Sequence, residues 1–249
     1  MKLDDFETIP FKEKVLDDEG NEVPNFRASR MVSCYWSSYR DHKNGVEPLP
    51  ITDELDEIFT IGSKEHYDDE VLTEGARNIV ESEKEMKLVH KSGKFTITGH
   101  FDYKKFDFYG MYYEDLKTCK VESFRYFIKS IDEGLSKDYI HQLSIYAYED
   151  AHYIGYYIER GVVTRILKRK KYASDKRIIR MSIEDKLLPP EKVREFILRH
   201  PVILCVMGMI DEAKLIALCK IQMAKEKWKC TNCQYANNIK ECPVYATLK

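Results

Sequence analysis

The most constraining feature of this 249-residue chain is a pair of strand-like segments that carry acidic residues near position 100. Residues 94–99 alternate β-branched side chains up to Gly99, and residues 109–118 are aromatic and apolar on both sides of an acidic pair. Such runs, bounded by glycine, are typical of β-strands. The pattern predicts two neighbouring strands, with Asp102 at the end of the first and Glu114 within the second.

Asp102, Glu114 and Lys117 are residue types that suit phosphodiester hydrolysis. Two converging carboxylates hold a hard divalent cation, which prefers oxygen ligands. A lysine beside the metal positions a water and stabilises the charge that develops on a phosphoryl group. Because side chains alternate along a strand, Glu114 and Lys117 point to opposite faces unless the strand bulges. The pattern therefore predicts a metal site on these strands, with a bulge that turns Lys117 toward it.

Asp102 with the run Glu114-Asp115-Leu116-Lys117-Thr118 resembles the core motif of the PD-(D/E)XK nucleases, and more specifically their RecB-like branch. That branch has a G-x-x-x-H helix before the core and a Q-x-x-x-Y helix after it. This chain has GSKEH ending at His66 and QLSIY from Gln142 to Tyr146, in the same order. Together these motifs cover roughly residues 60–150 and predict a helix over residues 61–87 that carries His66.

The resemblance implies a role for each of these residues. The side chains of His66, Asp102 and Glu114 would hold a bound Mg²⁺ or Mn²⁺. The backbone carbonyl of Asp115 would be a further ligand. Lys117 would orient the attacking water and stabilise the developing charge. Gln142 and Tyr146 would support the site or the scissile strand.

Four of the seven cysteines form a second candidate metal site. Seven scattered cysteines without a signal peptide do not indicate a secreted disulfide framework. Cys230, Cys233 and Cys242 cluster near the end of the chain, and Cys34 lies far before the strands. Thiolates gathered in a reducing compartment are typical metal ligands. Four of them fit either tetrahedral zinc or an iron–sulfur cluster.

One cysteine before the core and three after it resembles the CRISPR-adaptation exonucleases and the AddB-type nuclease domains. The resemblance implies a [4Fe–4S] cluster that joins segments at about 29–40 and 228–245. The eight-residue gap before Cys242 is longer than these families usually show, which keeps zinc as an alternative. The other cysteines, Cys119, Cys205 and Cys219, lie in apolar or strand contexts and are expected to pack as small hydrophobic residues.

Composition and periodicity predict one α/β domain over residues 1–249, with a core at about 60–170. The content of 43% hydrophobic residues suits a single large domain. Residues 1–26 are expected to be irregular. Strands are predicted at 88–92, 94–102, 106–110, 111–118, 152–160 and 162–168, and helices at 29–40, 52–58, 61–87, 136–150, 190–199 and 207–227. This order predicts a mixed central sheet flanked by helices, as in the restriction-endonuclease-like core.

A basic segment at residues 164–180 is a candidate DNA contact, although the net charge of the whole chain is only −2. The candidate residues are Arg165, Lys168, Arg169, Lys170 and Lys171. An ordinary solvated hairpin is the alternative. The longest apolar run, at residues 202–210, is too short to cross a membrane.

The resemblance implies a metal-dependent DNA nuclease, with single-stranded DNA cut from an end, 5′ to 3′, as the favoured activity. Recombination, repair, phage DNA processing and CRISPR spacer acquisition all suit such an enzyme. Its expected location is the cytoplasm, or the host cytoplasm for a phage protein. Expected partners are DNA, proteins of a recombination or CRISPR-adaptation complex, and a second copy of the chain. Alternatives are a structure-specific endonuclease on the same core and a non-catalytic Fe–S or zinc module that binds DNA.

Overall fold

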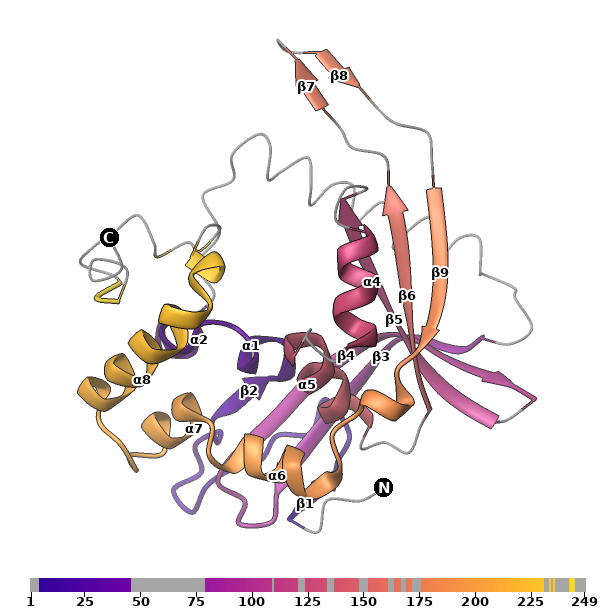
Figure 1. Cartoon of the computed structure of the whole chain (residues 1–249). Coiled ribbons are helices and arrows are strands. Elements are labelled where there is room, and N and C mark those ends of the chain that lie inside the picture. The colour runs from indigo at the N-terminus through magenta and orange to yellow at the C-terminus, as the bar shows by residue number, and fades with distance from the viewer. Residues whose placement is uncertain are drawn as a thin grey trace. The chain divides into compact units, whose positions relative to one another are not determined.

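The computed structural model has a mixed β-sheet flanked by helices, which confirms the predicted α/β class (Figure 1). The structure describes residues 5–45, 79–108, 110–120, 124–133, 137–147, 152–160, 164–166, 169–171, 176–230, 233, 235 and 242–244. It describes the backbone alone of residues 79–84, 107, 110–111, 113, 118–120, 124–125, 127, 132, 152–160, 164–166, 169–171, 176–182 and 184. Hydrogen bonding orders the strands of the sheet as β1 (Phe6–Thr8), β3 (Ile79–His90), β4 (Thr96–Asp107), β5 (Gly110–Lys120), β6 (His152–Arg160) and β9 (Lys176–Ser182). The strand β2 (Asn25–Arg27) also pairs with β4.

The chain divides into two compact units. Unit 1 consists of Met1, Glu57–Glu85 and His100–Leu188, and unit 2 of Lys2–Asp56, Met86–Gly99 and Pro189–Lys249. The strands β3 (Ile79–His90) and β4 (Thr96–Asp107) contribute residues to both units.

Unit 1 is built on a run of adjacent strands. The strand β5 (Gly110–Lys120) is antiparallel to β4 and parallel to β6 (His152–Arg160), and β6 is antiparallel to β9 (Lys176–Ser182). A parallel pair needs a long crossover. The crossover from β5 to β6 contains α4 (Phe124–Asp132) and α5 (Lys137–Tyr146).

The remaining elements of unit 1 lie between β6 and the end of the unit. A two-stranded ribbon of β7 (Thr164–Ile166) and β8 (Arg169–Lys171) joins β6 to β9, as Figure 1 shows. The 3-10 helix η3 (Glu184–Lys186) follows β9.

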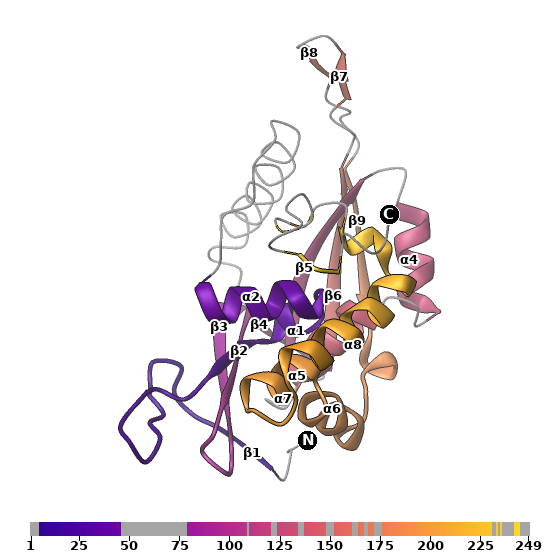
Figure 2. The same cartoon turned by 90° about the vertical axis from the view of Figure 1, so that its left-hand side faces the viewer.

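Unit 2 combines short strands with a group of helices (Figure 2). The strand β1 (Phe6–Thr8) is antiparallel to β3, and β2 (Asn25–Arg27) is parallel to β4. A tight turn links β3 to β4. Gly93 has φ +67° there, which is a conformation that glycine adopts without steric cost.

The helices of unit 2 begin with α1 (Ala28–Met31) and α2 (Tyr35–Asn44). They continue with α6 (Pro190–Leu198), α7 (Pro201–Val206), α8 (Glu212–Lys225) and the 3-10 helix η4 (Lys227–Cys230). Proline opens α6 and α7, where its missing N–H is not needed. Asp211 caps α8 by accepting a hydrogen bond of 2.7 Å from the Lys214 N–H. The helices α7 and α8 both pack against α2.

Several predicted boundaries differ from the structure. The helix predicted over 61–87 is wrong over its last part, because residues 79–87 belong to β3. The charged run at 81–87 favours a helix by propensity, but Met86 and Leu88 alternate into the core as strand residues do. The rest of that predicted helix, and the one at 52–58, lie outside the described residues. The region 1–26, predicted to be irregular, contains the short strands β1 and β2.

Candidate functional site

Strand alternation decides which acidic side chains of unit 1 lie together. In the antiparallel pair β4–β5, Tyr103 lies opposite Glu114, so these two residues share one face of the sheet. Asp102 precedes Tyr103 and Asp115 follows Glu114, and both therefore point to the other face. The carboxylate of Asp102 accepts a hydrogen bond from the Leu116 N–H, which places Asp102 against β5 beside Asp115.

Lys117 joins this face because it lies two residues after Asp115. Its ammonium group forms an ion pair with the Asp115 carboxylate. The Asp115 side chain is only 4% exposed and that of Lys117 is 19% exposed. Burial alone would lower the pKa of Lys117, but the carboxylates of Asp115 and Asp102 outweigh it and hold this pKa above its ordinary value. Asp102, Asp115 and Lys117 are therefore one electrostatically coupled group.

Glu114 lies elsewhere, and the orientation predicted for it is wrong. Its carboxylate forms a buried ion pair of 2.6 Å with Lys105 Nζ on the opposite face of the sheet. Lys105 also lies over the ring of Tyr103, with Nζ 4.4 Å from the ring centroid. The predicted bulge is not present in residues 112–120, which pair one to one with β6. Without a bulge, Lys117 shares its face with Asp115 and not with Glu114.

Helix α5 contributes further side chains to this site. Gln142 Nε2 donates a hydrogen bond of 2.9 Å to Tyr146 Oη, and both side chains are buried. The Tyr146 ring packs edge-on against Phe101, which precedes Asp102, with centroids 4.6 Å apart. Burial and the Asp115 carboxylate raise the pKa of Tyr146 to about 12. Tyr146 therefore stays protonated beside the acidic group.

The sequence patterns did not identify Tyr139, which also lies in α5 near Lys117. Lys117 Nζ lies 5.5 Å from the centroid of the Tyr139 ring. Tyr139 is three residues before Gln142, and residues at this spacing share one face of a helix. That spacing was the available signal, because the pattern Tyr139, Gln142, Tyr146 follows a single helical face.

The chemistry of Asp102 and Asp115 fits a hard divalent cation. Mg²⁺ is typically bound through one or two carboxylates together with substrate phosphate oxygens. Among the residues that the structure describes, no group of three His, Cys, Asp or Glu side chains forms a metal site. Asp102 and Asp115 are therefore the two candidate carboxylate ligands for such an ion on this face of unit 1. The predicted ligand His66 lies outside the described residues.

The four cysteines predicted as metal ligands all lie in unit 2. Cys34 comes immediately before α2, Cys230 ends η4, and both are buried, as is Cys242. Cys233 is half-buried. Burial raises the pKa of Cys230 to about 11, and the nearby sulfur atoms of Cys34, Cys233 and Cys242 add to this shift. These cysteines from both ends of the chain lie in one unit, but no three of the described His, Cys, Asp and Glu side chains are grouped so that they could hold a metal ion, and the predicted centre stays a prediction.

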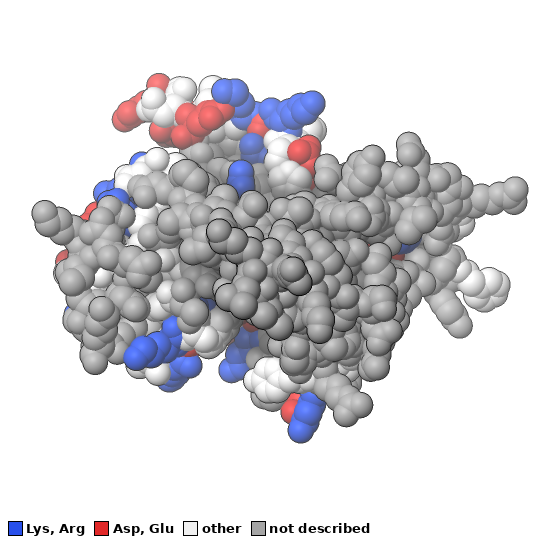
Figure 3. Space-filling model, turned by 90° about the horizontal axis from the view of Figure 1, so that it is seen from above, with Lys and Arg blue, Asp and Glu red and all other residues white. Residues whose placement is uncertain are grey.

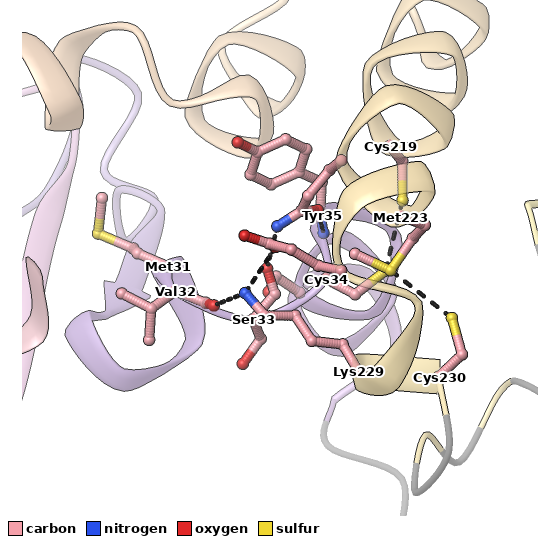
Figure 4. A network of polar contacts seen from close by, with 12 residues as sticks. Met31, Val32, Ser33, Cys34, Tyr35, Cys219, Met223, Lys229 and Cys230 are labelled. Carbon is pink, nitrogen blue, oxygen red and sulfur yellow. Dashed lines mark hydrogen bonds and ion pairs between the residues drawn. The ribbon is translucent and has the colours of Figure 1, made fainter. Parts of the chain in front are cut away.

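A further thiol, Cys219 of α8, takes part in this group (Figure 4). Cys219 Sγ lies 3.3 Å from Cys34 Sγ, and Cys230 Sγ lies 3.6 Å from the sulfur of Met223. The contact with the Cys219 thiol lowers the pKa of Cys34 to about 7, helped by backbone N–H groups at the start of α2. Cys219 is buried as expected, and its sulfur contacts another thiol.

The candidate DNA-binding residues have only their backbone described, or none of their structure. Arg165 lies in β7, and Arg169, Lys170 and Lys171 form β8. Lys168 lies outside the described residues, and the side chain of Cys119 is likewise not described. On the face seen in Figure 3, the described Lys and Arg residues lie in small groups next to Asp and Glu. The described surface of that face therefore carries charges of both signs.

Comparisons with known proteins place this chain by its fold alone. No protein-family model matches the sequence. A search of curated proteins also finds no match. Among solved structures, the chain is similar to the crystal structure of SSO0001, with a TM-score of 0.50 and 14% sequence identity. The similarity covers 90% of this chain and 88% of that one. No helix in the described part of the chain combines the length and apolar character that a membrane span needs.

Proposed function

We propose that this protein is a metal-dependent DNA nuclease that hydrolyses phosphodiester bonds at the face formed by Asp102, Asp115 and Lys117. The observation that carries the proposal is the convergence of these three side chains on one side of the β4–β5 pair. Two carboxylates and a lysine that remains charged are the groups that phosphoryl transfer uses.

Asp102 and Asp115 would hold the Mg²⁺ or Mn²⁺ ion, with His66 as a further ligand implied by the sequence resemblance. The bound ion would supply Lewis-acid polarisation of a phosphoryl oxygen. Because Asp115 is buried, its carboxylate lies in a medium that screens charge poorly, and its attraction for a cation is correspondingly strong.

Lys117 would act as a cation and not as a base. The pKa of Lys117 lies above its ordinary value, so its amine carries a proton at neutral pH. A protonated amine donates hydrogen bonds, which orients the attacking water and stabilises the negative charge that develops on the phosphate. The proton of the water must then be accepted by another group, such as a second water or a phosphate oxygen.

Gln142 and Tyr146 would hold the geometry of the site. The Tyr146 oxygen accepts from Gln142, which leaves the Tyr146 O–H hydrogen to donate elsewhere. Since Tyr146 also packs on Phe101, the pair fixes α5 against the strand segment that carries Asp102. The ribbon β7–β8, with its arginine and lysine residues, is the proposed contact for the DNA backbone.

The cysteine group is proposed as a structural metal centre of unit 2. Its four predicted ligands, from both ends of the chain, suit either the [4Fe–4S] cluster that the resemblance implies or a zinc ion. In either case the energy of metal binding would stabilise the fold of unit 2.

An assay with end-labelled DNA tests the proposed activity. The wild-type protein is incubated with single-stranded and double-stranded substrates in Mg²⁺, Mn²⁺ or EDTA. We expect cleavage with either metal, faster on single strands, and none in EDTA. Lys117→Ala should bind DNA normally and lose at least about 100-fold in cleavage rate, since it removes transition-state stabilisation. Binding without cleavage in both metals would instead favour the non-catalytic DNA-binding alternative.

A further inference from the structure

The tip of the β4–β5 hairpin carries two exposed aromatic side chains that the proposed chemistry does not use. Asp107 pairs with Gly110, so Phe108 lies in the turn that joins the two strands. Phe108 is 97% exposed, and Phe106, two positions earlier in β4, is 45% exposed. Single exposed apolar residues are common on protein surfaces, but small and polar residues are the usual choice for a tight turn. Two such rings at one hairpin tip therefore indicate a binding surface.

Strand alternation places Phe106 on the same face of β4 as the proposed site. The residues of β4 that point to one face are all buried, namely Phe101, Tyr103 and Lys105. The residues between them point to the opposite face. On that face Asp102 and Lys104 are half-buried and Phe106 is exposed, so exposure increases toward the hairpin tip. This face of the strand therefore leads from Asp102 to the exposed rings.

The spacing along β4 suits a bound strand of DNA. At a rise of about 3.3 Å per residue, Phe106 lies about 13 Å from Asp102 along the strand. Stacked nucleotides of one DNA strand are about 3.4 Å apart, so a base roughly four nucleotides or fewer from a phosphate at Asp102 reaches the ring. Lys104 lies between the two residues on the same face, and its positive charge is complementary to the DNA backbone.

We propose that Phe106 and Phe108 form a stacking platform for the bases of single-stranded DNA that enters the site. Aromatic side chains bind single strands by stacking on successive bases, because every base has a π-face. In a duplex these faces are already stacked on one another, so the platform selects single strands. The platform binds bases, whereas the proposed role of the ribbon β7–β8 is to contact phosphates. This inference rests on the proposed nuclease function, which brings DNA to this face.

The fluorescence of a Phe108→Trp variant tests stacking directly. The variant is titrated with oligothymidine in EDTA, so that the DNA binds without being cut. We expect its added emission to be quenched by oligothymidine and not by a sugar–phosphate chain of the same length without bases. The wild type, which has two tryptophans of its own, gives the background. Unchanged emission at saturating oligothymidine would overturn the proposal.

Substitutions at the two positions separate stacking from other contacts. Phe106→Ala and Phe108→Ala should each weaken oligothymidine binding by at least about 5-fold, the lower end of the effect of losing one base–aromatic stack. Phe108→Leu should also weaken binding and Phe108→Tyr should not, because only tyrosine keeps an aromatic ring. The slope of log affinity against log salt should keep its wild-type value in all four variants, because no phosphate contact is removed.

The variant Tyr126→Ala is the matched control. Tyr126 lies in α4 of the same unit and is 74% exposed. Tyr126→Ala should bind oligothymidine like the wild type, and a loss equal to that of Phe108→Ala would overturn the assignment to the hairpin tip. A lower molecular mass of Phe106→Ala or Phe108→Ala in solution, with unchanged DNA affinity, would show instead that the rings contact a second copy of the chain.

The platform and the nuclease chemistry are tested separately, because binding and quenching are measured without metal. Quenching by oligothymidine, together with no cleavage in Mg²⁺ or Mn²⁺, would support the platform and refute the nuclease chemistry. Cleavage by the wild type, together with wild-type DNA affinity in Phe106→Ala and Phe108→Ala, would refute the platform and leave the nuclease chemistry standing.

Discussion

Glu114 and Asp115 are adjacent acidic residues whose surroundings differ because a strand sends successive side chains to opposite faces. Asp115 lies beside Asp102 and Lys117, whereas Glu114 forms a buried ion pair with Lys105. The first arrangement couples charges of both signs in a group suited to binding a cation. The ion pair of Glu114 with Lys105 neutralises a buried carboxylate, and we assign it a structural role.

The ion pair of Lys105 with Glu114 yields a prediction about stability. Both side chains are almost fully buried, so removing one partner leaves a buried charge without its counterion. We expect Lys105→Met to lower the free energy of unfolding by about 3–5 kcal/mol. The double variant Lys105→Met/Glu114→Gln should regain much of this loss, because no buried charge remains. Urea unfolding of the single and double variants measures the difference, and equal stability of Lys105→Met and wild type would refute the structural role.

Among the elements of unit 1, α5 and the ribbon β7–β8 contribute to the proposed site in different ways. Helix α5 presents Tyr139, Gln142 and Tyr146 along one face, and contacts of this face reach Lys117 and Phe101. In the proposed site, this helix would position the strand residues. The ribbon β7–β8 has a basic sequence, which suits contact with a phosphate backbone.

The ribbon gives a prediction about salt dependence. If it contacts DNA, the triple variant Arg165→Glu, Arg169→Glu and Lys171→Glu should weaken binding. The slope of log affinity against log salt should fall by about 0.7 for each single-strand phosphate that the ribbon no longer neutralises. Cleavage at saturating DNA should persist. A matched triple reversal of exposed lysines on α8, at Lys214, Lys220 and Lys225, is the control, and an equal change of slope in both would show that the ribbon has no specific role.

For the molecule as a whole, the sequence predicted the α/β class and much of the strand and helix order. The strand predicted at 152–160 has the observed bounds of β6, and the helix predicted at 190–199 begins at the residue where α6 begins. The charged residues at 81–87 misled the prediction, because pairing within the sheet overrides helical propensity there.

The candidate site was predicted in its residue types but not in its geometry. Asp102 and Lys117 lie together as expected, since the motif places them on adjacent strands. Asp115, and not Glu114, lies on the face of Asp102 and Lys117 because of the pairing register and because residues 112–120 contain no bulge. The spacing of the motif alone specifies neither feature. Cys219 was missed because its apolar context gives no sign of the distant Cys34 thiol.

The cysteine centre gives a prediction about the stability of unit 2. Cys34 immediately precedes α2 and Cys230 ends η4, so a metal held by the four predicted cysteine ligands would tie α2 to the end of the chain. We expect removal of the metal under reducing conditions to lower the melting temperature by at least about 5 °C. Limited proteolysis should then cut first within α2, α7 and α8. Restoring the metal should reverse both effects, and an unchanged melting temperature would argue against a structural centre.

If catalysis takes place on the face of Asp102, Asp115 and Lys117, two isosteric variants of adjacent residues should differ sharply in activity. Asp115→Asn and Glu114→Gln each remove one negative charge with little change in shape, on opposite faces of the same strand. We measure the rate of single-stranded DNA cleavage in saturating Mn²⁺, at a temperature where both variants are folded. The predicted result is a loss of at least about 100-fold in Asp115→Asn and a change of less than about 5-fold in Glu114→Gln. The reverse order, with Asp115→Asn near wild-type activity and Glu114→Gln inactive, would contradict catalysis on this face.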